Sequence, residues 1–526
     1  MQGVHFTKLD RRQMDSLGIT EAQVIEQIEI FRKADFFVHL HRPCTLEDGV
    51  HTISSLDSDR YLLLHEQAAR EGRFLKFVPA SGAATRMFQS LLQIYYMPHF
   101  LEVEELHHRA EQGVAVACDF LRFLGGLRQF PFLDDLKQAM TTDGFSLDAL
   151  LRQCEFRVIL DYLLTKRGLN YGTLPKALLK FHRYPDECRT AFEEHLAESA
   201  QYMDNGCGRC RVHFTVSVEH EQGFRELMER VGSLYEARFR TSYEIGYSFQ
   251  KTSTNTVAVD MRNRLFRDRY GRIHFRPGGH GALLENLNDL HPDLVYIKNI
   301  DNLVPDRLKA PVVLWKKILG GCLVDLQDRV HALLRDLTRD PGSDLVDRGA
   351  AYCREVLMIP FPFGFEGWSV DRKREFIVGK LDRPIRVCGV VRNRGEPGGA
   401  PFWVKGRDGE YSIEYSIQIV EKAQVDFESE EQRSIWMSST HFNPVDLVCG
   451  LRDYRGNPFD LRRHVDKDAV FISRKSKDGR DLKALELPGL WNGSMADWIT
   501  YIVEVPGETF NPVKSVYDLL RPNHQV

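Results

Sequence analysis

Phe74-Leu75-Lys76-Phe77-Val78-Pro79-Ala80-Ser81-Gly82-Ala83-Ala84-Thr85-Arg86-Met87 joins an apolar run to a turn of small residues. Residues 74–78 have the length and composition of a short buried strand. Apolar residues at helical spacing follow from Arg86 to Leu92. The stretch therefore predicts a strand, a turn and a helix in succession.

Strands and helices continue to alternate beyond this unit. We expect strands at 211–216, 243–249 and 294–297, and an amphipathic helix at 223–237. Such alternation is typical of an α/β fold in which helices cover a mostly parallel, Rossmann-like sheet.

The length of the chain, 526 residues, exceeds what one hydrophobic core usually supports. Residues 1–70 are expected to form a helical N-terminal region, in which Thr20 precedes an apolar-periodic stretch. Residues 71–340 are expected to form the main α/β domain, with a helical insertion at about 97–170. After a turn-rich joint, residues 341–526 are expected to form an α+β domain rich in strands.

Charge and hydropathy argue against several classes of protein. Lys and Arg number 70 and Asp and Glu 74, without a long block of one sign, so we expect neither a nucleic-acid nor a membrane-surface partner. No window approaches the roughly 18 apolar residues of a membrane span, and the first residues lack a signal-peptide pattern, which indicates a cytoplasmic protein. The sequence does not define an oligomeric state.

The ten cysteines are scattered over a large chain, which favours reduced thiols over a disulfide framework. Cys207 and Cys210 form a CxxC pair. A zinc ribbon needs a second such pair, and the sequence has none, so this pair is only a weak indication of a metal or redox site.

The turn after the first strand is the first candidate site. At the start of a helix, exposed backbone N–H groups bind phosphate oxygens. The residues that would supply them are Ser81, Gly82, Ala83, Ala84 and Thr85. Arg86 would add a charge-assisted contact. The alternative is a packing turn with Arg86 on a solvated face, and the P-loop pattern Gly-x-x-x-x-Gly-Lys-Ser/Thr is missing here.

This turn resembles the signature of sugar nucleotidyltransferases, a small-residue strand end followed by Gly-x-Gly-Thr-Arg-Met or Leu. Gly82, Thr85, Arg86 and Met87 match the pattern, and Ala84 stands where the family has its second glycine. The resemblance implies that the turn holds a nucleoside triphosphate and that Arg86 contacts the leaving pyrophosphate.

Leu174-Pro175-Lys176-Ala177-Leu178-Leu179 resembles the Pro-Lys-x-Leu-Leu segment that follows the signature in the same family. The family's lysine contacts phosphate, so the resemblance implies a catalytic role for Lys176. In physical terms Lys176 is a compact cation after a proline that stiffens its turn. Without the neighbouring match it would be interpreted as an ordinary surface lysine.

Two further segments resemble UDP-N-acetylhexosamine pyrophosphorylases. Tyr247-Ser248-Phe249-Gln250 is similar to their Phe-x-Gln strand end, and Arg276-Pro277-Gly278-Gly279-His280-Gly281-Ala282-Leu283 is similar to their Pro-Gly-Gly-Asn-Gly loop. Related UDP-glucose enzymes carry Pro-Gly-His-Gly. The resemblance implies a base and sugar pocket shaped by Gln250, Gly278, Gly279, His280 and Gly281. His280 as a general base is the less favoured alternative.

Tyr296-Ile297-Lys298-Asn299-Ile300-Asp301-Asn302 is similar to the Val-Asp-Asn strand end of the same pyrophosphorylases, where the aspartate holds magnesium. Mg²⁺ prefers oxygen ligands, and one carboxylate with phosphate oxygens and water is sufficient. The resemblance implies Mg²⁺ as cofactor and Asp301 as its ligand. In isolation, Asp-Asn after a strand is usually a turn.

The C-terminal region contains candidate contacts to the sugar phosphate. The segment from Glu396 to Trp403 includes Gly398 and Gly399 and would form a glycine-rich loop with an aromatic wall, or else a turn beside packed aromatic residues. Phe510-Asn511-Pro512-Val513-Lys514 resembles the late Pro-x-Lys segment of UDP-sugar pyrophosphorylases, which implies a phosphate contact for Lys514.

Four other stretches resemble an uncharacterised bacterial family related to these transferases; they are 77–88, 275–286, 441–447 and 486–492. Together the motifs predict an Mg²⁺-dependent nucleotidyltransferase. Its substrates would be a nucleoside triphosphate and a sugar 1-phosphate, or another phosphorylated acceptor, and its products a nucleotide sugar and pyrophosphate.

Two alternatives remain open at the level of sequence. Asn299-Ile300-Asp301 is a partial Asp-x-Asp motif, as in nucleotide-sugar-dependent glycosyltransferases. Arg86 and Lys176 argue against that class, because its reactions have no leaving pyrophosphate to bind. The second alternative is a catalytically silent nucleotide-binding regulatory protein, which Ala84 in the signature turn suggests.

Overall fold

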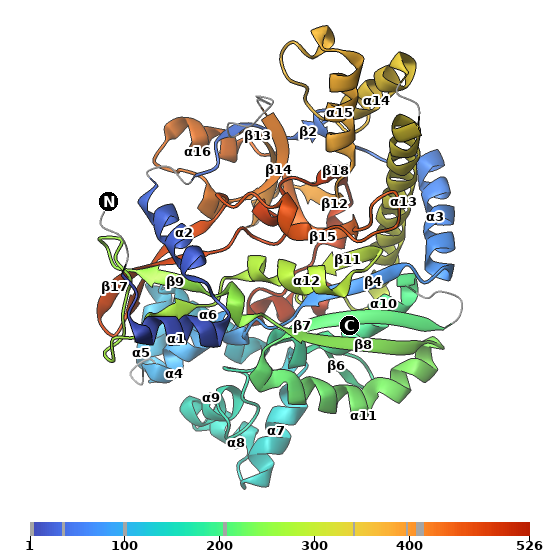
Figure 1. The fold of residues 1–526 in the computed structure, drawn as a ribbon. Coiled ribbons are helices and arrows are strands. Elements are labelled where there is room, and N and C mark those ends of the chain that lie inside the picture. The colour runs from blue at the N-terminus through green and yellow to red at the C-terminus, as the bar shows by residue number, and fades with distance from the viewer. Residues whose placement is uncertain are drawn as a thin grey trace. The chain divides into compact units, whose positions relative to one another are not determined.

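The computed structural model describes residues 5–33, 37–97, 102–203, 208–339, 342–395, 398–406 and 415–526. The chain forms two compact units, each assembled from segments that are distant in sequence (Figure 1). Unit 1 contains residues 1–77, 248–297 and 316–507, and unit 2 contains residues 78–247, 298–315 and 508–526.

Unit 1 holds most of the strands. Its helices are α1 (Lys8–Leu17), α2 (Glu21–Arg32), α3 (Ser55–Arg70), α12 (Leu284–Leu290), α14 (Ser343–Glu355), α15 (Val370–Leu381), α16 (Glu430–Met437) and most of α13 (Lys309–Arg339). Its strands are β1 (Leu40–Pro43), β2 (Thr45–Leu46), β3 (Gly49–Val50), most of β4 (Phe74–Pro79), β9 (Thr256–Val259), β10 (Phe275–Arg276), most of β11 (Leu294–Lys298), β12 (Ile385–Arg392), β13 (Gly399–Lys405), β14 (Tyr415–Glu421), β15 (His441–Gly450), β16 (Phe471–Lys477), β17 (Arg480–Glu486) and β18 (Ile499–Glu504).

The main sheet of unit 1 runs in the order β1-β13-β15-β11-β4. β11 pairs with β4 in parallel, from Leu294 opposite Phe74 to Ile297 opposite Phe77, and β12 pairs with β18 in parallel. Antiparallel pairs of β12 with β15 and of β13 with β14 extend the sheet. The expected α/β fold around a central sheet with parallel strands is confirmed, and it is mixed because these C-terminal strands join it.

Burial explains why β4 and β11 have nearly continuous apolar sequences. Both faces of a parallel strand are covered in an α/β fold, so neither strand has an alternating pattern. Phe77, Val295 and Ile297 belong to one buried cluster with residues of the C-terminal strands, such as Cys449 and Ile502. The predicted strands 74–78 and 294–297 are confirmed.

Helix α2 begins where the sequence indicates, because the Thr20 side chain accepts a hydrogen bond from the Gln23 N–H and completes a capping box. Helix α13 is 31 residues long. It lies beside α3 (Figure 1), where Arg60 pairs with Asp325 at 2.6 Å.

Unit 2 is mainly helical. Its helices are α4 (Gln89–Tyr96), α5 (Val103–Glu111), α6 (Ala115–Gly126), α7 (Leu133–Thr142), α8 (Leu147–Arg152), α9 (Phe156–Leu164), α10 (Ala191–Met203) and α11 (Glu221–Phe239). Its strands are the neighbours β7 (Arg209–Val216) and β8 (Ser242–Phe249), and the antiparallel pair β5 (Lys180–Arg183) and β6 (Cys188–Thr190). The described residues between 102 and 170 are mainly helical, and their assignment as an insertion stays a prediction. All residues of α10 except Gln201 are buried.

The N-terminal region contains more than the expected helices. Strand β1 lies between α2 and α3 and pairs antiparallel with β13, about 360 residues later in the chain. Its partner is too distant in sequence for a local pattern to indicate the pairing. The expected joint at 340–341 lies outside the described residues, and the proposed boundaries at 70 and 340 stay predictions.

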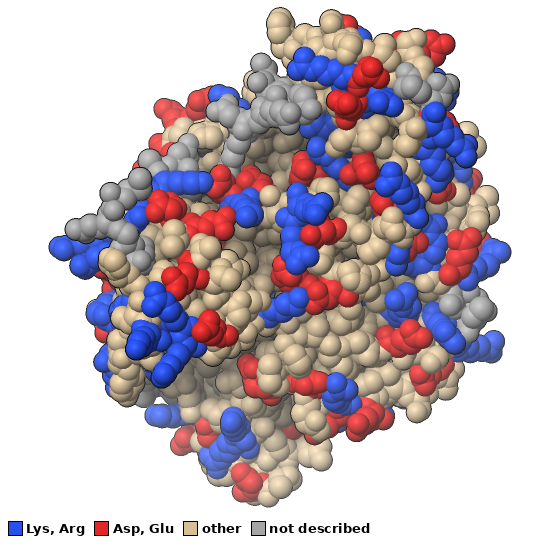
Figure 2. Space-filling view, in the orientation of Figure 1, with Lys and Arg blue, Asp and Glu red and all other residues tan. Residues whose placement is uncertain are grey.

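Surface charge follows the composition. Figure 2 shows Lys and Arg interspersed with Asp and Glu on the face in view. Within the described ranges, no helix combines the length and the apolar character that crossing a membrane requires.

Candidate functional site

The signature turn lies in unit 2, directly after β4. The chain passes through the exposed residues Gly82 and Ala83 into a short 3₁₀ helix, Ala84–Arg86, and then into α4. A Cβ atom added at Gly82 would meet nothing within 4 Å, so the turn is open at that position. Arg86 and Thr85 are exposed on the 3₁₀ helix.

Ala84 has a backbone conformation that any residue can adopt, since it lies in the 3₁₀ helix and its φ is not positive. Its N–H donates to the Leu174 carbonyl at 2.9 Å. The substitution of the family's second glycine is therefore compatible with the turn, but this N–H is already engaged by the chain itself. The N–H groups that remain candidates for phosphate are those of the neighbouring residues.

The segment that carries Lys176 is joined to the signature turn. Ala83 and Pro175 form an antiparallel bridge, and the Lys176 N–H donates to the Gly82 carbonyl at 3.3 Å. Two motifs that are about ninety residues apart in sequence thus form one backbone arrangement.

Lys176, Asp301 and Lys514 meet in a single ionic cluster, which we call the Lys–Asp–Lys cluster. Lys176 Nζ lies 2.7 Å from Asp301 Oδ2, and Lys514 Nζ lies 3.1 Å from both Asp301 oxygens. Lys176 Nζ also donates to the Val513 carbonyl at 2.9 Å, and the Val513 N–H donates to the Asp301 carbonyl. Three candidates from distant parts of the sequence are brought together here.

Burial and charge act in opposite directions on this cluster. Burial alone would raise the pKa of the Asp301 carboxyl, but Lys514 and Lys176 outweigh it and lower that pKa below its ordinary value. Burial lowers the pKa of Lys176 although Asp301 opposes the shift. Two ammonium groups against one carboxylate give the cluster an excess of positive charge, which suits an anionic ligand such as phosphate.

The C-terminal segment has a fixed backbone at Lys514. Asp518 Oδ2 accepts hydrogen bonds from the Lys514 N–H at 2.8 Å and from the Ser515 N–H at 2.7 Å. The Val516 N–H donates to the carbonyl of Met87, the last residue of the signature motif. Asp518 was not singled out from the sequence, although the Ser-x-x-Asp spacing of a capping box could have indicated it.

The fit of a magnesium ion depends on Asp301. Among the described residues, no group of three or more His, Cys, Asp or Glu side chains could hold a metal ion. A single carboxylate suffices if substrate phosphate and water supply the other oxygens. Both Asp301 oxygens carry lysine contacts in this arrangement, so a cation needs one of them to be released.

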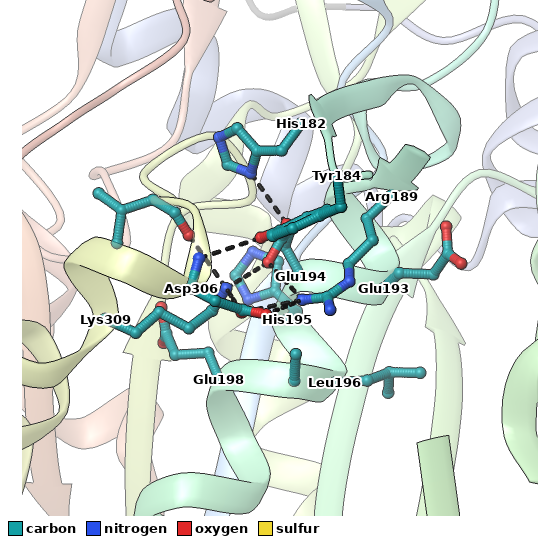
Figure 3. A network of polar contacts seen from close by, with 12 residues as sticks. His182, Tyr184, Arg189, Glu193, Glu194, His195, Leu196, Glu198, Asp306 and Lys309 are labelled. Carbon is teal, nitrogen blue, oxygen red and sulfur yellow. Dashed lines mark hydrogen bonds and ion pairs between the residues drawn. The ribbon is translucent and has the colours of Figure 1, made fainter. Parts of the chain in front are cut away.

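A second ionic network surrounds the N-terminal part of α10 (Figure 3). Glu194 is fully buried; its Oε1 accepts from His182 Nδ1 at 2.9 Å and from the Tyr184 hydroxyl at 2.8 Å. Its Oε2 forms an ion pair with Lys309, and Arg189 Nη1 lies 3.8 Å away. Burial would raise the pKa of Glu194, but these cations together lower it below the ordinary value.

Each segment of the Lys–Asp–Lys cluster continues into this network. Each cluster residue has a member of the network a few positions later in the chain. His182 comes after Lys176, Lys309 comes after Asp301, and His524 comes after Lys514. His524 Nδ1 lies 3.1 Å from His182 Nε2. The network therefore fixes all three segments to one helix.

Helix α10 also holds the strand end that carries Asp301. Glu198 pairs with Lys298 at 2.5 Å, and His195 Nε2 lies 3.2 Å from the Ile300 carbonyl. These buried charges were not predicted from the sequence. The available signal was the presence of several carboxylates in a segment whose other residues are typical of a helix buried on all sides.

The remaining candidates lie in unit 1. Gln250 follows β8 and is partly buried. The strand end before it is held by Asn286, whose Nδ2 donates to Ser248 Oγ at 2.8 Å and to the Phe249 carbonyl at 2.7 Å.

The glycine loop of unit 1 packs against the segment after β17. A Cβ atom at Gly281 would lie 2.0 Å from the Pro488 carbonyl oxygen, and one at Gly278 would lie 2.4 Å from the Thr254 carbonyl oxygen. Gly279 has φ +78° and packs on Glu486. Close approach of the chain to itself accounts for these glycines, and the loop continues through a 3₁₀ turn into α12.

His280 is part of the same packing. Its Nδ1 accepts a hydrogen bond from the Leu490 N–H at 3.2 Å, and its ring lies 4.5 Å from the Trp491 ring. Burial lowers the pKa of His280 to about 4, so the ring is neutral near pH 7. Because Nδ1 already accepts a hydrogen bond, only Nε2 could act on a ligand, which disfavours the alternative of a general base.

The other sequence candidates have different outcomes. Glu396 and Cys207 lie outside the described residues, and Cys210 is buried. A Cβ atom at Gly398 would lie 2.3 Å from the Phe442 ring, and Gly399 begins β13. Gly398 fits the alternative of packing beside an aromatic residue, whereas a Cβ atom at Gly399 would meet the Val420 carbonyl oxygen at 3.1 Å.

A family matches nearly the whole chain. The chain belongs to the family described as Domain of unknown function (DUF4301), over residues 7–525. No curated protein sequence matches it. The resemblance to a family of unknown function, predicted from the motifs, is confirmed.

Solved structures give distant likenesses. A point mutant of UDP-glucose pyrophosphorylase from Leishmania major in complex with UDP-glucose has 13% identity and a TM-score of 0.44, with 98% of this chain and 79% of that chain covered. The uridine diphosphate N-acetylglucosamine pyrophosphorylase from Trypanosoma brucei has 13% identity and a TM-score of 0.47, with 98% and 80% covered. A putative UDP-N-acetylglucosamine pyrophosphorylase from Entamoeba histolytica has 10% identity and a TM-score of 0.41, with 88% and 83% covered.

Proposed function

We propose that this protein is a nucleotidyltransferase that joins a nucleoside triphosphate to a sugar 1-phosphate, or another phosphorylated acceptor, and releases pyrophosphate. The observation that carries the proposal is the convergence of the signature turn, Lys176, Asp301 and Lys514 in unit 2. A packing turn and an ordinary surface lysine would not explain a buried lysine beside that turn.

In this reaction an oxygen of the acceptor phosphate attacks the α-phosphorus of the triphosphate. A phosphorus–oxygen bond forms there, and the bond from the α-phosphorus to the bridging oxygen breaks, so that pyrophosphate leaves with the electron pair. A phosphate nucleophile needs little acid–base assistance, and positioning and charge neutralisation dominate the catalysis.

The residues of unit 2 have distinct roles in this proposal. The neighbours of Ala84 in the signature turn, Ser81, Gly82, Ala83 and Thr85, bind the triphosphate through backbone N–H groups. The exposed Arg86 contacts the departing pyrophosphate. Lys176 and Lys514 neutralise the phosphates that react. Lys176 is fixed by two partners, so it enters the reaction already oriented.

Mg²⁺ is the expected cofactor, and when bound it would neutralise phosphate charge and orient the phosphate oxygens. Asp301 is the residue that would hold it. Gln250 and residues 278–281 are proposed to shape the base and sugar pocket, with the glycines acting through the shape of the loop.

The test is pyrophosphate release from a matrix of nucleoside triphosphates and sugar 1-phosphates with Mg²⁺. Arg86→Ala and Asp301→Ala serve as controls. A signal that depends on both side chains supports nucleotidyl transfer and identifies the substrates. A pyrophosphate signal that survives in both variants contradicts the roles proposed for Arg86 and Asp301. Transfer of sugar from a nucleotide sugar without pyrophosphate release contradicts the proposal and favours a glycosyltransferase. Nucleotide binding without turnover across the matrix contradicts it in favour of a regulatory protein.

A further inference from the structure

We propose that Lys514 blocks the metal-binding oxygens of Asp301 until substrate phosphate draws this lysine away. This inference rests on the proposed function, because it concerns the order in which phosphate and cation bind at the same cluster. The order follows from a difference between the two lysines that contact Asp301.

Lys176 is the permanent partner of Asp301. Its side chain is 13% exposed, and its Nζ bonds both to Asp301 Oδ2 and to the Val513 carbonyl. Breaking a buried pair leaves an uncompensated buried charge, which is strongly unfavourable. Lys176 therefore stays in place when a ligand arrives.

Lys514 is the exchangeable partner. Its side chain is 52% exposed, while its backbone N–H is fixed by Asp518. Asp301 is buried, but water and salt reach the lysine end of this ion pair and screen it, so the contact is weaker than one buried at both ends. The ammonium group can therefore leave Asp301 while the backbone of the segment keeps its position.

Asp301 Oδ1 is the oxygen that such a movement releases. Within the described part of the chain, Oδ1 is contacted by Lys514, whereas Oδ2 is contacted by Lys514 and Lys176. A divalent cation at Oδ1 and an ammonium group at 3.1 Å from the same oxygen would repel each other. Cation binding at Oδ1 therefore competes with the Lys514 contact.

Phosphate supplies the competing attraction. The signature turn is joined to Lys176 by the Ala83–Pro175 bridge, so a triphosphate held by that turn lies at the cluster. A phosphate group carries more negative charge than one carboxylate and forms strong charge-assisted hydrogen bonds with lysine. Lys514 then moves to the phosphate, and Asp301 becomes available for Mg²⁺.

Thermodynamic linkage makes the proposal measurable without turnover. If phosphate increases the affinity for the cation by some factor, the cation increases the affinity for phosphate by the same factor. Removing the Lys514 ammonium group should increase the affinity for the cation even when no phosphate is present.

The experiment is a titration of the full chain with Mn²⁺, followed by the paramagnetic resonance signal of free Mn²⁺. We expect Lys514→Met to bind Mn²⁺ about tenfold more tightly than the wild type, within the usual range of coupling between sites. Lys251→Met is the matched control, since Lys251 pairs with Asp289 at 2.6 Å and is also partly exposed. It removes the same charge and should leave Mn²⁺ affinity unchanged.

Two further arms identify the site. Adding Asp301→Asn to Lys514→Met should abolish the tighter binding. A nucleoside monophosphate, which chelates the metal weakly, should tighten Mn²⁺ binding to the wild type and not to Lys514→Met. A thermal melt of each variant confirms that it is folded; if Asp301→Asn unfolds, the nucleoside monophosphate arm alone decides.

Unchanged or weaker Mn²⁺ binding by Lys514→Met overturns the inference, and so does tighter binding that persists without Asp301. These outcomes are independent of the pyrophosphate assay. If the protein releases pyrophosphate but Lys514→Met does not bind Mn²⁺ more tightly, the proposed function holds and the exchange of Lys514 is wrong. If Lys514→Met binds Mn²⁺ more tightly but no pyrophosphate is released, the exchange of Lys514 holds and the proposed function is wrong.

Discussion

Replacing Lys176 by methionine separates the chemical role of this lysine from its structural role. Burial lowers the pKa of Lys176 despite the neighbouring carboxylate, so the ammonium form is disfavoured where it lies. Methionine has a similar length without the charge, and Asp301 keeps Lys514 as a partner. We expect Lys176→Met to change the free energy of unfolding by less than about 1.5 kcal/mol, against about 3–5 kcal/mol for a buried charge left unpaired.

The effect on turnover should be much larger. Lys176 is proposed to contact the phosphates that react, in a position fixed by Asp301 and the Val513 carbonyl. Removing one preoriented contact to developing charge typically lowers kcat about 10²- to 10³-fold. The variant is thus expected to be stable and nearly inactive.

Urea denaturation measures the first quantity and pyrophosphate release the second, on the same preparation. Lys251→Met controls for the loss of a lysine from an ion pair to which the proposal gives no role in the reaction. The reasoning fails if Lys176→Met loses 3 kcal/mol or more of stability while turnover is retained. That result would identify Lys176 as a structural residue.

Three further predictions concern stability. Glu194→Gln removes a fully buried carboxylate that Lys309 and Arg189 share, although Lys309 keeps Asp306 as a partner, and urea denaturation should show a loss of about 3 kcal/mol or more; a near-neutral result would mean that the network contributes little. Because the pKa of His280 is about 4 instead of 6.5, the unfolded chain gains this proton first, and stability falls as pH decreases from about 6.5 to about 4; His280→Asn should reduce that slope in melts across this range, and an unchanged slope would contradict the assignment. A Cβ atom at Gly281 would lie 2.0 Å from a facing carbonyl oxygen, whereas one at Gly82 would meet nothing within 4 Å, so Gly281→Ala should cost about 1–3 kcal/mol and Gly82→Ala almost nothing in thermal melts.

The elements with strong local patterns could be predicted from the sequence. The strand at 74–78, the helix after Thr20 and the strand at 294–297 each have apolar spacing and boundary residues that act over a few positions. The motifs also named Lys176 and Asp301, which the structure brings together.

The parts that could not be predicted depend on pairing between distant segments. Strand β1 forms through its pairing with β13. It is too short for a local sequence pattern to predict it. Glu194 and Lys309 are charged residues in buried positions, and sequence patterns assign charged residues to the surface unless the partner is known. Gly281 looks like a ligand-binding glycine in the sequence, while its neighbour in the fold is the chain's own backbone.

The assembly of unit 2 from residues 78–247, 298–315 and 508–526 has a consequence for biosynthesis. Lys514 and Asp518 leave the ribosome more than 400 residues after the signature turn. During translation the earlier segments can collapse, but the Lys–Asp–Lys cluster lacks one of its cations until the last part of the chain is made. A nascent or C-terminally shortened chain would therefore hold Asp301 and Lys176 in an incomplete site, and the proposed activity would begin only when synthesis has passed residue 514.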